Sequence, residues 1–265
     1  MDLSNPEELG GKFLKSGKVK DIYEMDNDTL MFHFTDRVSA YDVVLPSKIP
    51  RKGEVLCKFA EYWFKTLEVE SHMVKTIGKD VMIVKKLNMI PIESIMRGYL
   101  YGSLFERVKK GEVKLEIEQV MAKKLPAPLF DPTTKHEIHD SPITESEILR
   151  RGLTNEEELK WIVDKSTLIY NQMSKKAEET GFILGDLKLE FGRLGNKIIL
   201  ADSIGPDEFR LWLTDKYEIG KTQDSFDKQP IRDWLAEIGY KDMIQQALKK
   251  GESPPPPPEL PTELI

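Results

Sequence analysis

The chain has 265 residues, with 39 Lys and Arg against 45 Asp and Glu, so its formal net charge is −6. An acidic chain without a dense basic stripe is a poor nucleic-acid binder, because that affinity comes from clustered Lys and Arg. Hydrophobic residues make up 40% of the chain, which supports a packed core and excludes wholesale disorder.

The N-terminal residues, as far as Gly11, lack the basic start and the apolar core of a signal peptide. No apolar run approaches the roughly 18 residues that a membrane-spanning helix needs. The single cysteine, Cys57, cannot form an intrachain disulfide, and it suits a reducing compartment. These features predict a cytoplasmic protein without a membrane partner, and they favour a packed thiol over a nucleophile at Cys57.

The first third of the chain has the pattern of an antiparallel sheet. Residues 18–24 and 29–34 are short, rich in β-forming residues and separated by the turn cluster DND, which predicts a hairpin. Residues 81–86 add an apolar run of strand length. Between them, apolar residues recur at helical spacing over residues 56–67 and predict an amphipathic helix.

The middle of the chain, residues 91–145, is irregular and rich in Gly and Pro. Capping-box patterns follow at Thr144 and Thr154, each with a Glu three residues later. The second pattern opens a long helix with one apolar face, and Gly181 is placed to end it.

Two strand-like segments, residues 182–191 and 197–202, are joined through Gly195-Asn196, which indicates a hairpin. Two short helices near residues 230–249 follow. The last residues include five consecutive prolines and are expected to be extended and solvated. The chain lacks regular βαβ alternation and any GxGxxG or GxxxxGK[ST] string, so the pattern favours an α+β fold with an antiparallel sheet.

Charged residues follow the strand period in the segment GFILGDLKLEFG. Side chains two apart in a strand point the same way, so Asp186, Lys188 and Glu190 are predicted to share one face. Such a row is also typical of the solvent face of an antiparallel sheet. Across the predicted hairpin, Asp202 returns toward Glu190.

The turn between these strands decides whether the two acids meet. A two-residue turn at Gly195-Asn196 places Ala201 opposite Glu190, whereas a three-residue loop or a bulge pairs Glu190 with Asp202. We predict the second arrangement, because two facing carboxylates repel each other unless a cation lies between them. Hard oxygen ligands of this kind suit Mg²⁺ that bridges the phosphates of a nucleotide.

Four other segments concentrate polar residues beside glycine, proline or a strand end. SGKVKDIY has a glycine turn with two lysines on one face, which suits phosphate binding. PIESIMRGYLYGSL sets an arginine and a serine among glycines, where they can grip a phosphate or carboxylate without crowding. TDRVSAYD is expected to be a loop at a strand end, and a proline-bounded loop contains TKHEIHD. The candidate residues are Lys18, Lys20, Arg97, Ser103, Asp36, Arg37, Ser39, Asp42, Lys135, His139 and Asp140.

Taken together and in order, the motifs GKVKDIY, TDRVSAYD, KKLNMIPIESIMRGYLYGS, TKHEIHD, GDLKLEFG, GPDEFRLW and SFDKQPIRDWL resemble the SAICAR synthetase family of purine biosynthesis. The resemblance runs from about residue 13 to 245. It implies an ATP- and Mg²⁺-dependent joining of L-aspartate to the carboxylate of carboxyaminoimidazole ribonucleotide (CAIR), with ADP and phosphate released. It also implies a fold like the ATP-grasp and kinase nucleotide sites, in which residues 1–90 form an antiparallel sheet over the nucleotide. Residues 91–250 then form an α+β domain for substrates and metal, and residues 251–265 a proline-rich tail.

The resemblance also implies a role for each matched residue. Lys188 and Asp186 are the catalytic candidates, and Glu190 and Asp202 the Mg²⁺ ligands. ATP binding falls to Lys18, Lys20, Val84, Lys85, Lys86 and Leu87. CAIR binding falls to Arg97, Ser103, Asp186, Lys188 and Arg210. Aspartate binding falls to Asp36, Arg37, Ser39, Asp42, Lys135, His139 and Asp140.

Two positions depart from the family pattern, because Ser203 replaces a second acid after Asp202 and residues 205–210 lack the usual hydroxyls of their loop. A small-molecule kinase with a similar ATP site remains the alternative function, although the chain has no HRD-like loop. The expected partners are small-molecule substrates only, and a homo-oligomer is left open.

Overall fold

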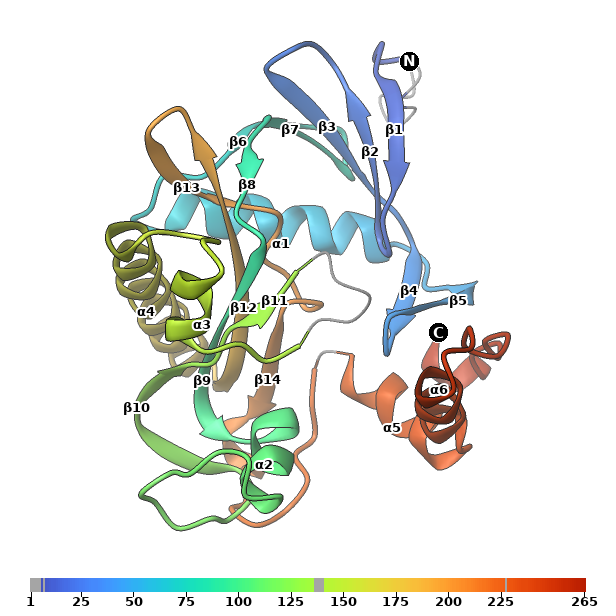
Figure 1. Ribbon diagram of the computed structural model, residues 1–265. Helices are drawn as coiled ribbons and strands as arrows, with labels where there is room; N and C mark the ends of the chain where they lie inside the picture. Colours follow the sequence, from blue (N-terminus) through green and yellow to red (C-terminus); the bar gives the residue numbers. More distant parts are fainter. Residues whose placement is uncertain (1–5, 7, 136–140, 227) are drawn as a thin grey trace. The chain divides into compact units, whose positions relative to one another are not determined.

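The structure is a computed structural model that describes residues 6, 8–135, 141–226 and 228–265. The chain separates into two compact units (Figure 1). Unit 1 comprises Met1–Lys65, His72–Lys86 and Asp227–Ile265, and unit 2 comprises Thr66–Ser71 and Leu87–Phe226. The C-terminal residues thus group with the N-terminal strands, whereas the sequence pattern places residues 91–250 in one domain.

Unit 1 is built on a five-stranded antiparallel sheet in the order β1-β2-β3-β7-β6. Its strands are β1 (Lys12–Ser16), β2 (Lys20–Glu24), β3 (Thr29–Phe34), β6 (Met73–Ile77) and β7 (Val81–Lys85). The predicted hairpin of β2 and β3 is confirmed. Its turn forms because the carboxylate of Asp26 accepts hydrogen bonds from the backbone N–H groups of Asp28 and Thr29, at 2.9 and 2.7 Å.

The predicted amphipathic helix is α1 (Lys52–Thr66), which begins four residues earlier than its apolar pattern. Cys57 lies on its buried face, and burial raises the pKa of this thiol to about 12. A thiol with so high a pKa is protonated near neutral pH and is a poor nucleophile. The prediction of a packed thiol is therefore confirmed.

A second hairpin and two helices complete unit 1. TDRVSAYD is not only a loop: β4 (Arg37–Ala40) and β5 (Val43–Lys48) pair through a two-residue turn. Both turn residues, Tyr41 and Asp42, have positive φ values of 50° and 64°. The helices α5 (Gln229–Glu237) and α6 (Tyr240–Lys249) contribute to a buried cluster with this hairpin. The buried members of that cluster are Val38, Ala40, Leu45, Ile231, Leu235, Tyr240, Ile244 and Leu260.

The proline-rich tail is extended, as expected, but it is not a solvated end. Only 6% of Leu260 is exposed, and its backbone N–H donates to Ser47 Oγ at 2.7 Å. The hydroxyl of Tyr240 donates to the carbonyl of Pro255, also at 2.7 Å. The prediction of a solvated tail is therefore wrong, because Leu260 fills a place in the unit 1 core. A short 3₁₀ turn, Thr262–Leu264, follows.

Unit 2 is organised around β9 and β12 in the strand order β10-β9-β12-β13. Its strands are β8 (Asn88–Met89), β9 (Ile92–Leu100), β10 (Lys123–Phe130), β11 (Thr133–Thr134), β12 (Phe182–Leu194), β13 (Lys197–Ala201) and β14 (Phe209–Leu213). A helix, α2 (Gly102–Lys109), follows β9, and a 3₁₀ turn, Thr214–Lys216, follows β14. The prediction that residues 91–145 are irregular is thus wrong, since β9 alone is a strand of nine residues, seven of them buried.

The helices α3 (Glu145–Arg150) and α4 (Glu156–Glu179) follow the strands β9, β10 and β11. Thr144 caps α3 as predicted, since its hydroxyl accepts from the backbone N–H of Glu147 at 3.2 Å. The cap of α4 is Asn155 with Glu158, one residue later than the Thr154 pattern predicts. Asn and Thr are both good N-caps, and here the Asn155 side chain accepts from Glu158 N at 2.9 Å. Within the described ranges, no helix combines the length and the apolar composition that crossing a bilayer requires.

Glu158 also ties α4 to β12, which gives a testable prediction. Its two carboxylate oxygens accept from Arg193 Nε and Nη2 at 2.6 and 2.7 Å, and this hydrogen bonding lowers the pKa of Glu158. We expect Glu158→Gln to lower the free energy of unfolding by about 1 kcal/mol at pH 7. Gln can also complete a capping box, so the substitution removes the charge of Glu158 but keeps its capping hydrogen bond.

The pH dependence of that loss follows from the lowered pKa. A carboxyl whose folded pKa lies below its unfolded pKa stabilises the fold above the unfolded value. The difference between wild type and Glu158→Gln should therefore shrink as the pH falls below the ordinary Glu pKa of 4.5. Urea unfolding of wild type and Glu158→Gln, at pH 7 and at lower pH, measures their free energies of unfolding. If the two proteins differ in this free energy by the same amount at all pH values, the prediction is wrong.

Candidate active site

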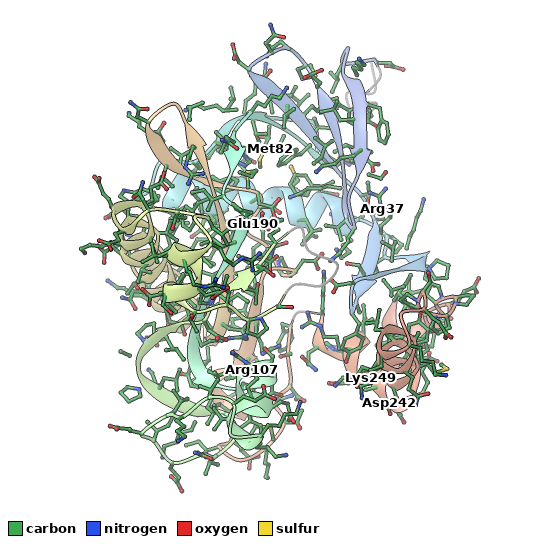
Figure 2. All side chains as sticks on the ribbon, viewed as in Figure 1. Arg37, Met82, Arg107, Glu190, Asp242 and Lys249 are labelled. Carbon is green, nitrogen blue, oxygen red and sulfur yellow. The ribbon has the colours of Figure 1, made fainter. Side chains whose placement is uncertain are left out.

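Charged residues form a row along β12, the central strand of unit 2. The row is buried at one end, since only 2% of Glu190, which is labelled in Figure 2, is exposed. Lys188 donates to Glu190 at 2.8 Å, so these residues share a face as predicted. Beneath them, Phe191 packs edge-on against Trp161 of α4, with ring centroids 5.7 Å apart. The row is therefore not the solvent face of a sheet.

Two buried arginines meet at one carboxylate oxygen of this row. Arg97 of β9 and Arg210 of β14 donate to Asp186 Oδ2 at 2.9 and 2.7 Å. They converge because Asp186 lies opposite both arginines in the strand pairing. Arg210 also stacks over the ring of Tyr101 at 5.0 Å. The backbone at Gly102 approaches this group so closely that a Cβ there would lie 2.9 Å from Arg210 Nη1.

Each of the three guanidinium nitrogens of Arg97 donates a hydrogen bond. Its Nε donates to Asp131 at 3.0 Å and its Nη2 donates to Ser103 at 2.9 Å. Asp131 also accepts from Arg107 at 2.6 Å. Three guanidinium groups thus face two carboxylates, Asp131 and Asp186, which leaves a net positive charge. A planar, bidentate and electropositive group of this kind suits a phosphate monoester.

Lys188 is surrounded by negative charge, in contrast to the arginine cluster at Asp186. Its ammonium donates to Glu93 at 3.1 Å as well as to Glu190. Burial lowers the pKa of Lys188, but the negative charges of Glu190, Glu93, Asp202 and Glu208 outweigh burial and raise it well above the ordinary value. Lys188 is therefore a permanent cation at neutral pH.

The predicted pairing of Glu190 with Asp202 is wrong. The β12–β13 hairpin has the two-residue turn, with Leu194 paired to Lys197 and Glu190 opposite Ala201. Asp202 follows the end of β13 and has a positive φ of 61°, which takes it out of the strand alternation. Its charge nevertheless acts on Lys188. Repulsion between the acids is relieved by lysines, since Lys135 and Lys188 both form ion pairs with Glu190.

The acidic end of the row fits a divalent cation whose coordination shell is completed by a substrate. The negative charges of Glu93, Glu190, Asp202 and Glu208 act on Lys188, and Lys135 also pairs with Glu190. Four carboxylates against two ammonium groups leave a formal excess of negative charge. In the part of the chain that the structure describes, no three His, Cys, Asp or Glu side chains are grouped to hold a metal ion. Mg²⁺ commonly takes only one or two carboxylates and completes its shell with phosphate and water.

Unit 1 holds the glycine-turn lysines. Lys18 is half exposed and pairs with Asp42, while Lys20 is buried with its ammonium 4.8 Å from the centre of the Phe32 ring. Arg37 holds this turn, because its Nη2 donates to the carbonyl of Gly17 at 3.0 Å and to Asp21 at 2.7 Å. The turn is therefore fixed by hydrogen bonds, with Lys18 near its tip.

The remaining candidates of unit 1 are spread over three places. Asp36 accepts from the backbone N–H of Gly53 at 3.0 Å and so caps the first turn of α1. Ser39 is buried with Lys228 Nζ 3.4 Å away. The segment 84–87 crosses the boundary between the units, which falls after Lys86. Lys86 pairs with Glu24 at 2.7 Å.

Two predicted residues, His139 and Asp140, lie outside the described residues. Sequence reasoning missed Glu93, Asp131, Arg107 and Glu208. Glu93 and Arg97 are four residues apart, an even separation that places both on one face of a strand. That spacing signals Glu93 only once β9 is identified as a strand.

Comparisons with known proteins agree with the sequence motifs. The SAICAR synthetase family model matches residues 13–247. A phosphoribosylaminoimidazole-succinocarboxamide synthase of Nitrosopumilus maritimus is 51% identical over 256 residues, covering 96% of this chain and 93% of that protein. A SAICAR synthase structure from Saccharomyces cerevisiae, complexed with SAICAR, has a TM-score of 0.78 and 35% identity over 86% of this chain and 85% of that one. A type-2 SAICAR synthetase in complex with ADP has a TM-score of 0.71 and 29% identity, covering 91% and 99% of the two chains. The predicted α+β fold is confirmed.

Proposed function

The chain belongs to the SAICAR synthetase family, and from this premise we propose how its residues perform the ligation of that family. The reaction is the ATP-dependent joining of L-aspartate to the carboxylate of CAIR, which gives SAICAR, ADP and phosphate. The observation that carries the residue proposal is the β12 row, which has an electropositive end at Asp186 and an acidic end at Glu190.

The chemistry explains why the row needs both an electropositive end and an acidic end. A carboxylate is a poor acyl donor, so the γ-phosphoryl group of ATP is transferred to an oxygen of the CAIR carboxylate and ADP leaves. The amine of aspartate then attacks the acyl carbon, loses a proton and expels phosphate. Phosphoryl transfer depends mainly on positioning and on neutralising charge, so no covalent nucleophile of the protein is required.

The electropositive end fits the phosphate of CAIR. Arg97, Arg210 and Ser103 are the proposed phosphate contacts, since the two guanidinium groups are buried and already held by Asp186. Asp186 and Lys188 then face the imidazole and the carboxylate of CAIR. Lys188 is a cation whose raised pKa keeps it charged, so it stabilises negative charge on the transferring phosphoryl group.

The acidic end fits Mg²⁺, with Glu190 and Asp202 as its proposed protein ligands. When bound, Mg²⁺ supplies charge neutralisation at the ATP phosphates. Lys135 and Lys188 hold Glu190 in place.

The proposed ATP contacts of unit 1 are the lysines of the glycine turn and the segment 84–87. Lys18 is half exposed and available to a phosphate, while Lys20 contributes its charge from a buried position. Arg37 supports them by fixing the carbonyl of Gly17. For the adenine, the proposed contacts are Val84, Lys85, Lys86 and Leu87.

The proposed aspartate contacts are Asp36, Arg37, Ser39, Asp42, Lys135, His139 and Asp140. Asp36 and Arg37 already hold backbone groups, so we propose that they act by shaping the β4 region. A cytoplasmic location and small-molecule partners without nucleic acid are also part of the proposal.

An assay of ADP release tests the function. Purified protein with ATP, Mg²⁺, CAIR and L-aspartate should release ADP only when both co-substrates are present. ADP release with CAIR alone, accompanied by a stable phosphorylated product and no consumption of aspartate, would support the kinase alternative. Omission of Mg²⁺ by chelation should abolish the release, whereas unchanged release contradicts the metal proposal.

A further inference from the structure

A β-bulge at Gly185 sets which face of β12 carries the charged row. Leu184 lies opposite Leu211 of β14, but Asp186 lies opposite the adjacent residue, Arg210, so Gly185 is an extra residue in β12. A single extra residue sends every later side chain of a strand to the other face. Pairing of β12 with β9 begins directly after the bulge, at Asp186 and Arg97.

The change of face is visible in the residues on either side of the bulge. Ile183 belongs to a buried cluster with Tyr99 and Trp212. Tyr99 is two residues from Arg97 on β9, and Trp212 is two residues from Arg210 on β14, so both lie on the face of the arginines. Ile183 and Asp186 therefore share that face although they are three residues apart. Without the bulge, Asp186, Lys188 and Glu190 would face α4.

Two contacts on the bulge come from outside the strand pairing. A Cβ on Gly185 would lie 2.9 Å from the ring of Trp212, so this ring covers the extra residue and requires Gly there. On the other face, the hydroxyl of Tyr170 donates to the carbonyl of Leu184 at 2.6 Å. That carbonyl directly precedes the bulge, and the bond is buried.

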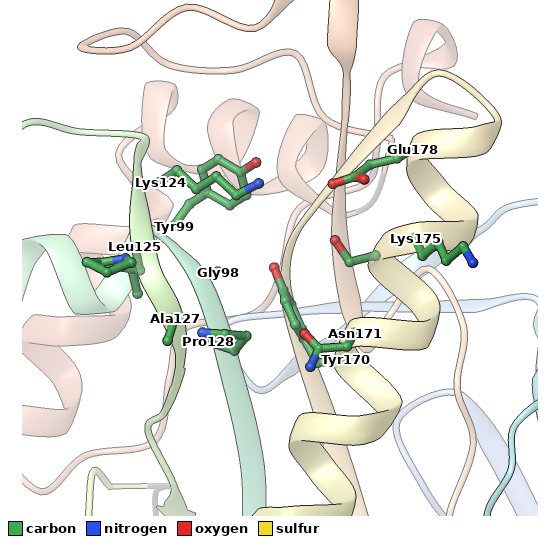
Figure 3. A pocket seen from close by; sticks show the side chains of 12 residues that line it. Gly98, Tyr99, Lys124, Leu125, Ala127, Pro128, Tyr170, Asn171, Lys175 and Glu178 are labelled. Carbon is green, nitrogen blue, oxygen red and sulfur yellow. The ribbon is translucent and has the colours of Figure 1, made fainter.

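Tyr170 reaches the carbonyl through a space that only glycine leaves open. A Cβ at Gly98 would lie 1.7 Å from the Tyr170 hydroxyl, so the ring occupies the position of a side chain on β9. Figure 3 shows Tyr170 extending from α4 toward the strand that contains Gly98. The ring also lines a cavity of about 260 Å³ with Leu125 and Pro128. The ring is buried, with 4% of Tyr170 exposed, and the hydrogen bond to Leu184 holds its hydroxyl end.

We propose that Tyr170 is a positioning residue for CAIR binding, which holds the bulge so that Asp186 meets Arg97 and Arg210. The inference rests on the proposed function for the identity of the ligand. Tyr170 itself lies on the α4 face of the sheet and acts only through Leu184. Loss of its hydroxyl leaves a buried carbonyl without its donor and lets the bulge shift along the strand.

The test compares Tyr170→Phe with a matched control, Tyr217→Phe. The Tyr217 hydroxyl donates to a backbone carbonyl at the same distance of 2.6 Å, but that carbonyl belongs to Ala122 and not to β12, and Phe keeps the ring that stacks on Trp212. We expect Tyr170→Phe to raise KM for CAIR about 10- to 100-fold, as a displaced contact does, with KM for ATP unchanged. Tyr217→Phe should leave both constants unchanged. Gly98→Ala, which drives a methyl group into the Tyr170 hydroxyl, should reproduce the effect of Tyr170→Phe.

A readout without activity separates this proposal from the proposed function. Amide hydrogen exchange over residues 184–188 should be faster in Tyr170→Phe than in wild type or Tyr217→Phe. Unchanged exchange there overturns the positioning role, whether or not the wild type is an active ligase. Faster exchange with unchanged KM for CAIR overturns the link to substrate binding. A wild type that releases no ADP contradicts the function alone, and the exchange result still decides the role of Tyr170.

Discussion

Glu190→Gln is expected to lower turnover about 100-fold or more, the scale of losing one preorganised electrostatic contact at a reacting phosphoryl group. Glu190 is almost fully buried and is held by Lys135 and Lys188. Gln preserves its shape but removes the charge that would bind Mg²⁺. The lysines then face fewer negative charges, so the site also loses affinity for a divalent cation. Steady-state ADP release at saturating substrates measures the effect.

Asp202→Asn should cause a loss of similar size, since it removes the second proposed metal ligand. Both variants should require more Mg²⁺ for half-maximal turnover, which a titration of Mg²⁺ at fixed ATP would show. Glu158→Gln is the matched control, because it makes the same exchange at an ion-paired Glu of unit 2 and leaves the β12 row intact. Wild-type turnover in Glu190→Gln would remove the metal assignment.

Arg97→Lys is expected to raise KM for CAIR about 100-fold, because charged hydrogen bonds of about 1.5–3 kcal/mol each are lost from a buried site. Arg97 donates to Asp131, Asp186 and Ser103 at once. A lysine keeps the positive charge but is a point charge without the planar fork that this geometry needs. Asp186 then keeps its hydrogen bond from Arg210 but loses the one from Arg97.

Arg193→Lys provides the control for this second prediction. It replaces another arginine that donates two hydrogen bonds to one carboxylate, that of Glu158. It should lower stability slightly and leave KM for CAIR unchanged. Equal KM values for CAIR in Arg97→Lys and wild type would refute the assignment of Arg97 to the phosphate of CAIR. Circular dichroism of both variants checks that the fold is retained.

Patterns that depend on one element were predictable from the sequence. The shared face of Lys188 and Glu190 follows from the period of a strand, and the β2–β3 hairpin from the Asp26 turn. Patterns that depend on a residue from elsewhere in the fold were not predictable. A longer loop or a bulge was predicted to pair Glu190 with Asp202 around a cation, but Glu190 lies opposite Ala201 and its charge is neutralised by Lys135 and Lys188.

Two further errors have the same origin in tertiary structure. The strand β9 escaped prediction because Glu93, Ser94 and Arg97 interrupt its apolar run. Glu93 and Arg97 are accommodated there by charged partners that lie far away in the sequence, Lys188 and Asp186. The five prolines suggested a solvated tail, yet Leu260 beyond them is buried. The bulge at Gly185, which sets the face of the charged row, involves Trp212 and Tyr170 and has no signal in its own segment beyond the glycine.

The discontinuity of unit 1 has a consequence for biogenesis. A ribosome makes residues 227–265 after all of unit 2, yet Leu235, Tyr240 and Leu260 are needed to bury Val38 and Leu45. The strands of unit 2 are all translated by Leu213 and so can assemble earlier. Domains commonly fold as units in the order of their synthesis. Here the hairpin of β4 and β5 instead lacks its apolar cover on the nascent polypeptide until α5, α6 and Leu260 have been made, so we expect it to need chaperone protection during that interval.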